Sequence, residues 1–232
     1  MVETFAPVGT VMHLDEQRVD SYGDKFIFAF PRNNPEKSVL KVKFPNGKSE
    51  QYVFDITQRE WEVQHINKVS NEYVSPNKSS QSRINKEAMD IGIARVSTAY
   101  PCPDKFAFTR PVNSLITGWF GSQRVYNGVP RSPHSGVDFK GNVGDKIIAP
   151  ADGQVSYLQD MFMTGLTMVI DHGCGVTTNY AHLSAADKKI GDVVKQGDVI
   201  ARIGASGLAT GPHLHWGANL GTIRLDPLLL VK

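Results

Sequence analysis

The spacing of histidines in the second half of the chain most constrains what this protein can fold into and do. Five of the seven histidines lie between residues 134 and 216. Within that window His213 and His215 alternate with Leu214, so in a β-strand the two imidazoles share one face. Histidine is the usual neutral nitrogen ligand of zinc and a proton-transfer group near neutral pH. The window therefore predicts a site built from imidazoles.

A segment about eighty residues earlier offers further ligands. His134 and Asp138 are four residues apart, and the residues around them favour a strand, on which both side chains face the same way. If this strand lies beside the His213–His215 strand, two imidazoles and one carboxylate converge. That set leaves the fourth position of a tetrahedral zinc ion open, which is typical of a catalytic site. Spacing alone does not decide which histidine of the pair is the ligand.

The same residues resemble the signatures of the LytM/lysostaphin-type zinc endopeptidases, which cut peptide cross-links in bacterial peptidoglycan. The signatures are His134-x-x-x-Asp138, Tyr180-Ala181-His182-Leu183 and His213-Leu214-His215, and the likeness covers roughly residues 108–230. The resemblance implies Zn²⁺ held by His134, Asp138 and His215. It also implies that His182 and His213 flank the bound water as general acid and base. No HExxH motif occurs, which excludes the helical metalloprotease arrangement.

The resemblance further implies a reaction, a partner and a location. The reaction is hydrolysis of an amide bond in peptidoglycan stem peptides or cross-links, by a water that zinc activates. The partner is the peptidoglycan peptide, and the location is periplasmic or extracellular. The first residues show no basic segment followed by an apolar one, as an export signal requires. Which peptidoglycan bond is cut stays open.

Composition excludes two other classes of function. There are 25 basic and 23 acidic residues, and this near balance, without a dense basic patch, argues against nucleic-acid binding. No apolar run approaches the length of a membrane span, so we expect no integral membrane segment.

The pattern of apolar residues predicts a mostly β chain in three parts. Residues 1–56 contain short alternating runs around an Asn46-Gly47 hairpin signal and predict an Ig-like β-sandwich. Residues 57–107 read as a connector, with an exposed loop at 71–81 and then a short helix. That helix is expected to place Ile84, Ala88, Ile91 and Val96 on one face. Residues 108–232 form the β-rich peptidase domain.

The two cysteines and the remaining histidines give no evidence of a catalytic role. Cys102 and Cys174 are compatible with one disulfide or with two unpaired buried thiols. His172 stands next to Gly173 and is interpreted as a turn residue. The two N-terminal histidines lack partners at ligand spacing and are interpreted as structural or surface residues.

Three alternatives to an active enzyme fit the sequence less well. Residues 147–155 and 191–200 also resemble halves of biotinyl and lipoyl carrier domains, but no suitable lysine setting occurs and the histidines stay unexplained. A catalytically silent regulator that activates other wall hydrolases would have substitutions among the five site positions, and this chain has none. A pure wall-binding module would need no His-x-His pair. Whether the N-terminal region regulates the active site within the same molecule is left open.

Overall fold

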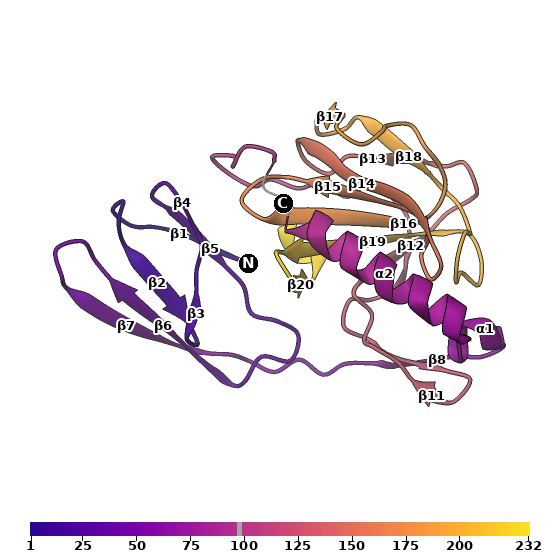
Figure 1. The fold of residues 1–232 in the computed structure, drawn as a ribbon, viewed down its shortest axis with the longest axis horizontal. Helices are drawn as coiled ribbons and strands as arrows, with labels where there is room; N and C mark the ends of the chain where they lie inside the picture. The colour runs from indigo at the N-terminus through magenta and orange to yellow at the C-terminus, as the bar shows by residue number, and fades with distance from the viewer. Residues whose placement is uncertain (97–98) are drawn as a thin grey trace. The chain divides into compact units, whose positions relative to one another are not determined.

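A computed structural model describes residues 1–96 and 99–232 and divides the chain into two compact units, Met1–Glu60 and Trp61–Lys232 (Figure 1). Strands dominate both units, so the expectation of a mostly β chain is confirmed. The boundary falls after Glu60. Of the connector predicted at residues 57–107, residues 61–107 belong to the same unit as the C-terminal half.

The N-terminal unit packs two small sheets against each other. One sheet has the strand order β1-β5-β4 and the other β3-β2-β6-β7. Phe26 and Phe28 of β5 share a core with Met12, Leu40 and Val42 of the second sheet, which makes the expected sandwich of short strands. The strands are β1 (Val2–Phe5), β2 (Val11–Leu14), β3 (Gln17–Arg18), β4 (Ser21–Tyr22), β5 (Lys25–Phe28), β6 (Lys37–Lys43) and β7 (Ser49–Asp55).

The C-terminal unit is built on a large, mostly antiparallel sheet. Within the described residues, the strands along its main path have the order β17-β14-β15-β16-β19-β12-β9. Strand β18 pairs with β13 and β16, and β20 pairs with β19. A parallel pairing of β8 with β10, joined by β11, adds a smaller sheet. The first elements are β8 (Val63–Ile66), α1 (Asn71–Val74), α2 (Lys78–Arg95), β9 (Ile116–Gly118), β10 (Gln123–Tyr126), β11 (Val129–Pro130), β12 (Gly136–Lys140) and β13 (Lys146–Ile148). The others are β14 (Gly153–Met161), β15 (Gly165–Asp171), β16 (Val176–Ala186), β17 (Val193–Val194), β18 (Val199–Ile203), β19 (His213–Leu220), β20 (Ile223–Leu225) and a 3₁₀ turn, Pro227–Leu230.

The main core lies on one face of this sheet. It includes Phe139, Met168, Tyr180, Leu183 and Trp216, all of them almost fully buried. Because side chains alternate along a strand, the neighbours of these residues point to the opposite face. That opposite face carries the candidate site.

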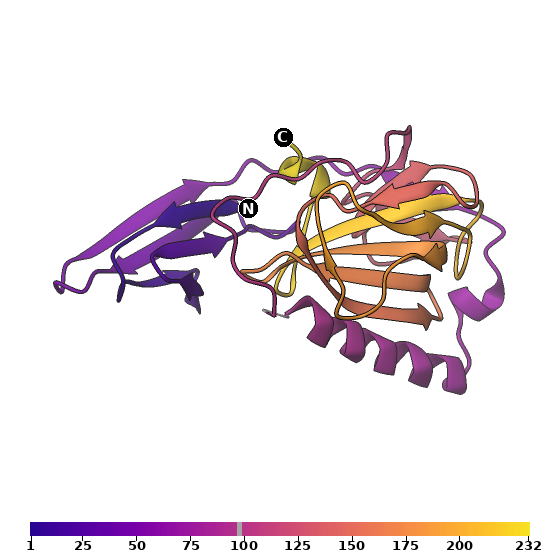
Figure 2. The same cartoon turned by 90° about the horizontal axis from the view of Figure 1, so that it is seen from above.

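Helix α2 runs along the strands of the C-terminal unit, as Figures 1 and 2 both show. Its Ile91 and Ala94 pack with Tyr157, Met161 and Val169 of β14 and β15. Val169 is opposite Asn179 in β16, and Asn179 is opposite Gly217 in β19. The helix and the site therefore lie on the same face of the sheet. The helix covers β14 and β15, and the site lies over β16 and β19.

The helix was expected from the sequence, but its start and its buried face were not. Asn77 caps it by accepting the N–H of Ser80 (2.9 Å). Helix therefore replaces both ends of the loop predicted at 71–81, with α1 at its start and α2 at its end. The buried residues are Glu87, Ile91 and Ala94, whereas Ala88 and Val96 are exposed. The predicted face is correct at buried Ile91 and half-buried Ile84 but wrong at Ala88 and Val96. Glu87 is buried instead of Ala88 because its carboxylate accepts the N–H of Phe162 in the neighbouring hairpin.

The segment before α2 lies along β10. The Asn127 side chain donates to the carbonyl of Val69 (2.8 Å) and accepts the N–H of the same residue (3.1 Å). Arg131 donates to the carbonyl of Val74. These bonds, together with the β8–β10 pairing, fix residues 63–74 as part of the C-terminal unit.

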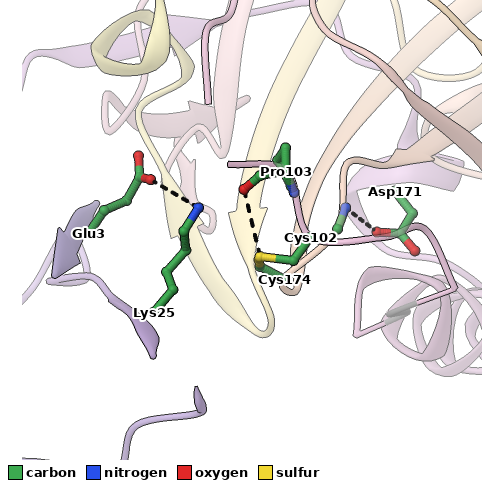
Figure 3. The surroundings of a disulfide bond; sticks show 7 residues. Glu3, Lys25, Cys102, Pro103, Asp171 and Cys174 are labelled. Atoms are coloured by element: carbon green, nitrogen blue, oxygen red, sulfur yellow. Dashed lines mark hydrogen bonds and ion pairs between the residues drawn. A yellow bond between two sulfur atoms is a disulfide. The ribbon is translucent and has the colours of Figure 1, made fainter. Parts of the chain in front are cut away.

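The two cysteines form a disulfide, which settles the open question (Figure 3). Cys102 precedes the peptidase strands, and Cys174 lies in the turn between β15 and β16, 72 residues further along the chain. Beside the bridge, Asp171 accepts the N–H of Tyr100 (3.1 Å) and that of Gly173 (2.8 Å). The bridge thus closes a large loop onto one corner of the sheet.

Helices long and apolar enough to cross a membrane do not occur in residues 1–96 and 99–232.

Candidate metal centre and active-site groove

The predicted ligands meet because β12 and β19 pair antiparallel in the middle of the sheet. Asp138 lies directly opposite His215, and Lys140 lies opposite His213. Directly opposed residues in such a pair place their side chains on the same face. Both histidines of the His-x-His pair therefore share a face with the carboxylate, as the alternation predicts.

Three donor atoms converge on this face when His134, two residues before β12, is added. His134 Nε2 lies 3.0 Å from Asp138 Oδ1 and 2.9 Å from His215 Nδ1. His215 Nδ1 lies 2.9 Å from the same Oδ1. Ligands about 2.0–2.1 Å from a tetrahedral zinc ion are roughly 3.3 Å apart, so this spacing suits one ion shared by all three. The residues are buried, and two imidazoles with one carboxylate are a donor set that fits zinc.

Neighbouring groups orient each donor. His134 Nδ1–H donates to the carbonyl of Trp119 (2.9 Å), which leaves the lone pair on Nε2 facing the cluster. Arg124 Nη2 lies 2.5 Å from Asp138 Oδ2, so the other carboxylate oxygen is directed to the imidazoles. The Trp119 carbonyl and Arg124 thus do not bind the metal themselves but orient the residues that would, as hydrogen-bond partners of ligands commonly do in metal sites.

Two glycines make room for the cluster. A Cβ at Gly136 would lie 2.9 Å from the His215 ring, and a Cβ at Gly118 would lie 2.6 Å from Asp138 Oδ2. Any larger residue would displace a donor atom. Residues 118 and 136 thus contribute to the site by lacking a side chain.

Burial and charge set the protonation of the ligands. Burial by itself raises the pKa of Asp138, but the hydrogen bonds and charges of His134 and His215 outweigh it and hold that pKa well below its usual value. Burial lowers the pKa of His215 to about 3, against the opposing effect of Asp138. A carboxylate and a neutral imidazole are the forms that bind a metal.

His182 reaches the site through a break in strand alternation. Ala181 is opposite His215 and faces the site, so regular alternation would turn His182 towards the core. Instead His182 has a left-handed backbone (φ 60°), and the pairing of β16 shifts register just beyond it. The ring consequently lies 4.6 Å from that of His213 and 6.3 Å from that of His215, measured between centroids.

The two histidines proposed as proton carriers are held in the same way. His182 Nδ1–H donates to the carbonyl of Ser206 (2.8 Å), and His213 Nδ1–H donates to that of Gly211 (2.8 Å). Each bond fixes one ring nitrogen and leaves Nε2 to the site; His213 Nε2 is 3.9 Å from Asp138 Oδ1. Burial, and secondarily the charge of His213, lowers the pKa of His182 to about 4. His182 is therefore neutral near pH 7 and can accept a proton.

The remaining histidines lie elsewhere. Both ring nitrogens of His172 are bonded within the protein, Nδ1 to the carbonyl of Asp152 and Nε2 to Thr178 Oγ1, each at 2.7 Å. This agrees with the structural role expected of it. His65 lies exposed in β8, and His13 belongs to the N-terminal unit.

Several contributors to the site carry no spacing signal in the sequence. The Trp119, Ser206 and Gly211 carbonyls act through backbone atoms, which any residue possesses. Gly118 contributes by close approach, and glycine is common enough that its position alone is uninformative. The Arg124–Asp138 ion pair joins residues 14 apart on different strands. Only the fold reveals the contacts through which these groups act on the site.

A cavity of about 430 Å³ opens beside the cluster. Asp138 and His213 line it on the metal side, and Gln64 and Ile66 of β8 line it on another. Leu208, Thr210, Gly211 and Pro212 complete the rim. One wall of the groove therefore comes from the segment that precedes α2.

Comparison with protein families assigns the domain. Residues 132–227, which include all five site residues, match the family described as Peptidase family M23. This part of the chain is an M23 peptidase domain. The resemblance to LytM/lysostaphin-type peptidases is confirmed at the level of the family.

Relatives of the M23 domain include named enzymes. The chain is 40% identical over 97 residues to an uncharacterized metalloprotease of Haemophilus influenzae, an alignment that covers 41% of this chain and 20% of the relative. It is 30% identical over 164 residues to the peptidoglycan DD-endopeptidase ShyB of Vibrio cholerae, covering 64% of this chain and 38% of the relative. The chain thus spans a fifth to two fifths of the length of these curated relatives.

A solved structure resembles nearly the whole chain. A crystal structure of a candidate M23 peptidase from Pseudomonas aeruginosa superposes with a TM-score of 0.74 at 26% identity. The match covers 98% of this chain and 90% of the other. Both units, and not only the M23 domain, therefore have counterparts in that protein.

Proposed function

We propose that the protein is a zinc-dependent endopeptidase that hydrolyses amide bonds in peptidoglycan stem peptides or cross-links. The observation that carries the proposal is the convergence of three donor atoms within 3.0 Å of one another, next to two histidines whose Nε2 atoms stay available. This arrangement lies in an M23 domain, and the relative from Vibrio cholerae is a peptidoglycan DD-endopeptidase.

His134, Asp138 and His215 would hold the metal. Zinc bound there supplies a Lewis acid that activates water and stabilises negative charge on the scissile carbonyl oxygen. The Trp119 carbonyl and Arg124 keep the donor atoms aimed at one point. Burial of the three ligands strengthens each of these interactions by excluding water.

His182 and His213 would move protons. Neutral His182 accepts the proton that the attacking water loses, at Nε2, and a protonated imidazole of the pair returns a proton to the leaving nitrogen. The rings are 4.6 Å apart, and the charge of His213 lowers the pKa of His182. The two are therefore not readily charged together, which suits a pair that passes one proton at a time.

A cell-envelope location follows from the same proposal. Peptidoglycan lies outside the cytoplasmic membrane, and the Cys102–Cys174 disulfide is stable in oxidising compartments of that kind. The disulfide closes residues before the peptidase strands onto the sheet that carries the site. Oxidation would thus contribute to the stability of the active unit.

The deciding experiment measures two quantities on one preparation: zinc per chain, and soluble muropeptides released from purified sacculi. We expect about one zinc and release for the natural chain, and loss of both for His215→Ala. A chain that binds no zinc and releases nothing would contradict the proposal. If zinc binds without release, the fragment 61–232, which keeps the groove wall, distinguishes inhibition by residues 1–60 from an inactive site.

A further inference from the structure

The groove beside the metal centre has an uneven distribution of charge. Its lining includes two cations, Arg124 and Lys140, and one carboxylate, Asp138. Asp138 is already shared between Arg124 and the histidine cluster. Among the residues that the structure describes, no carboxylate pairs with the Lys140 ammonium, so its charge faces the groove without compensation.

Strand pairing places Lys140 at a defined distance from the reaction centre. It follows Asp138 by two residues in β12, so both side chains point to the site face. It also lies directly opposite His213 in β19. The side chain is exposed, and its backbone is fixed by the bond from Lys140 N–H to the Leu115 carbonyl (2.9 Å). A flexible cation thus stands on a rigid strand at the edge of the metal centre.

We propose that Lys140 is a specificity-determining residue that binds a free carboxylate of the peptide substrate close to the scissile amide. An extended peptide advances about 3.3 Å per residue, which is also the step along a β-strand. Because Lys140 is two residues from the ligand Asp138, its ammonium group suits a carboxylate one or two residues from the bond that is cut. The inference rests on the proposed peptidase function. The carboxylate is either the chain-terminal one or that of a diamino acid in the cross-link.

The inference is tested by binding, separately from catalysis. The full-length, zinc-loaded chain with His182→Ala is titrated with three cross-linked peptides. The first has free carboxylates, the second is amidated at the chain terminus, and the third is amidated at the diamino acid. Lys140→Met removes the charge and Lys140→Arg keeps it. Lys146→Met removes an exposed lysine of β13 that does not line the groove and serves as the matched control.

We expect the free acid to bind about 10-fold more tightly than one of the two amides, as a charge-assisted contact at a partly exposed site allows. Lys140→Met should abolish this preference, whereas Lys140→Arg and Lys146→Met should retain it. The amide that binds weakly identifies which carboxylate is recognised. Equal dissociation constants for all three peptides, or a preference that survives Lys140→Met, would overturn the inference.

Failure of this inference is distinguishable from failure of the proposed function. Release of muropeptides from sacculi by the natural chain, with equal binding of acid and amides, would refute the carboxylate site and leave the peptidase proposal intact. Preferential binding of the acid, with no muropeptide release by either the natural chain or the fragment 61–232, would refute the peptidase proposal and leave the carboxylate site intact.

Discussion

The histidines of the site and His172 lie in or next to strands of the same sheet but use their ring nitrogens differently. His134, His182 and His213 each donate Nδ1–H to a backbone carbonyl and present Nε2 to the site. His172 bonds both nitrogens within the protein, and Thr178 extends the chain of bonds to the hydroxyl of Tyr180 (2.7 Å). Thr178 and Tyr180 lie opposite residues on the core face of β19.

The difference shows what makes a buried histidine functional. Burial lowers the pKa of His172 and that of His182 alike, to about 4 in each case. The pKa therefore does not separate the two roles. What separates them is whether one ring nitrogen is left for a metal, water or substrate.

Replacing His182 should have the largest effect on turnover among changes that spare the metal. His182→Ala removes a proton carrier but no ligand, so we expect about one zinc per chain and a fall in kcat on the order of 10²–10⁴-fold. Muropeptide release and zinc content are measured together. His172→Gln is the control and should keep kcat within a few-fold in the folded protein. Equal losses of kcat in both variants would refute the distinction drawn between the two histidines.

Removing the disulfide should strongly destabilise the corner that holds His172. The bridge closes a loop of 72 residues, for which chain entropy gives about 4 kcal/mol of unfolding free energy. Cys102→Ser combined with Cys174→Ser is compared with the natural chain by denaturant unfolding. The zinc content of the folded double variant should be unchanged, since the bridge does not contact the metal ligands. Loss of zinc in the folded fraction would show that the two regions are coupled.

Helix α2 should support His182 through a hairpin. The buried Glu87 carboxylate accepts the N–H of Phe162 (2.9 Å), and the nearby Thr164 carbonyl accepts the N–H of His182 (2.8 Å). Glu87→Ala removes the charged acceptor of the part-buried Phe162 N–H, so we expect a loss of about 1–3 kcal/mol in stability and a few-fold lower kcat with zinc retained. Exposed Glu72 on α1 provides the control, Glu72→Ala. An unchanged kcat in Glu87→Ala would confine the role of α2 to stability.

The pH dependence of stability should report His172 in the metal-free protein. The pKa of His172 is about 4 in the folded protein, against a reference value of 6.5 for the unfolded chain. Between these two pH values the unfolded chain binds more protons than the folded protein, so stability falls as the pH is lowered. His182 and His215 shift in the same direction, whereas stabilisation by Asp138 is lost only as the pH falls below its reference value of 3.8. His172→Gln should reduce the slope by about 1.4 kcal/mol per pH unit at most. Chelated samples unfolded at pH 4.5, 5.5 and 6.5 test this, and an unchanged slope would contradict burial of a neutral His172.

Local patterns in the sequence predict much of this protein. Alternation in His213-Leu214-His215 correctly places both imidazoles on the face of Asp138, because strand geometry repeats every two residues. The four-residue step from His134 to Asp138 was expected to lie on one strand, but His134 lies two residues before β12 begins and reaches the cluster from the preceding loop. The hairpin expected at Asn46-Gly47 joins β6 and β7, with Gly47 at a φ of +83° that glycine adopts without strain. Family resemblance adds the roles proposed for His182 and for His215.

Only the tertiary structure decides the features that depend on distant pairing. Contacts between residues far apart in the chain form the Cys102–Cys174 bridge and bring Gln64 to the groove wall. Such contacts also bury Glu87 of α2 and leave its neighbour Ala88 exposed. His182 turns to the site because of a left-handed backbone that alternation would not predict. Sequence periodicity reports which way a side chain points along its own element. Which element it then meets is determined by sheet pairing and packing, and these are properties of the whole fold.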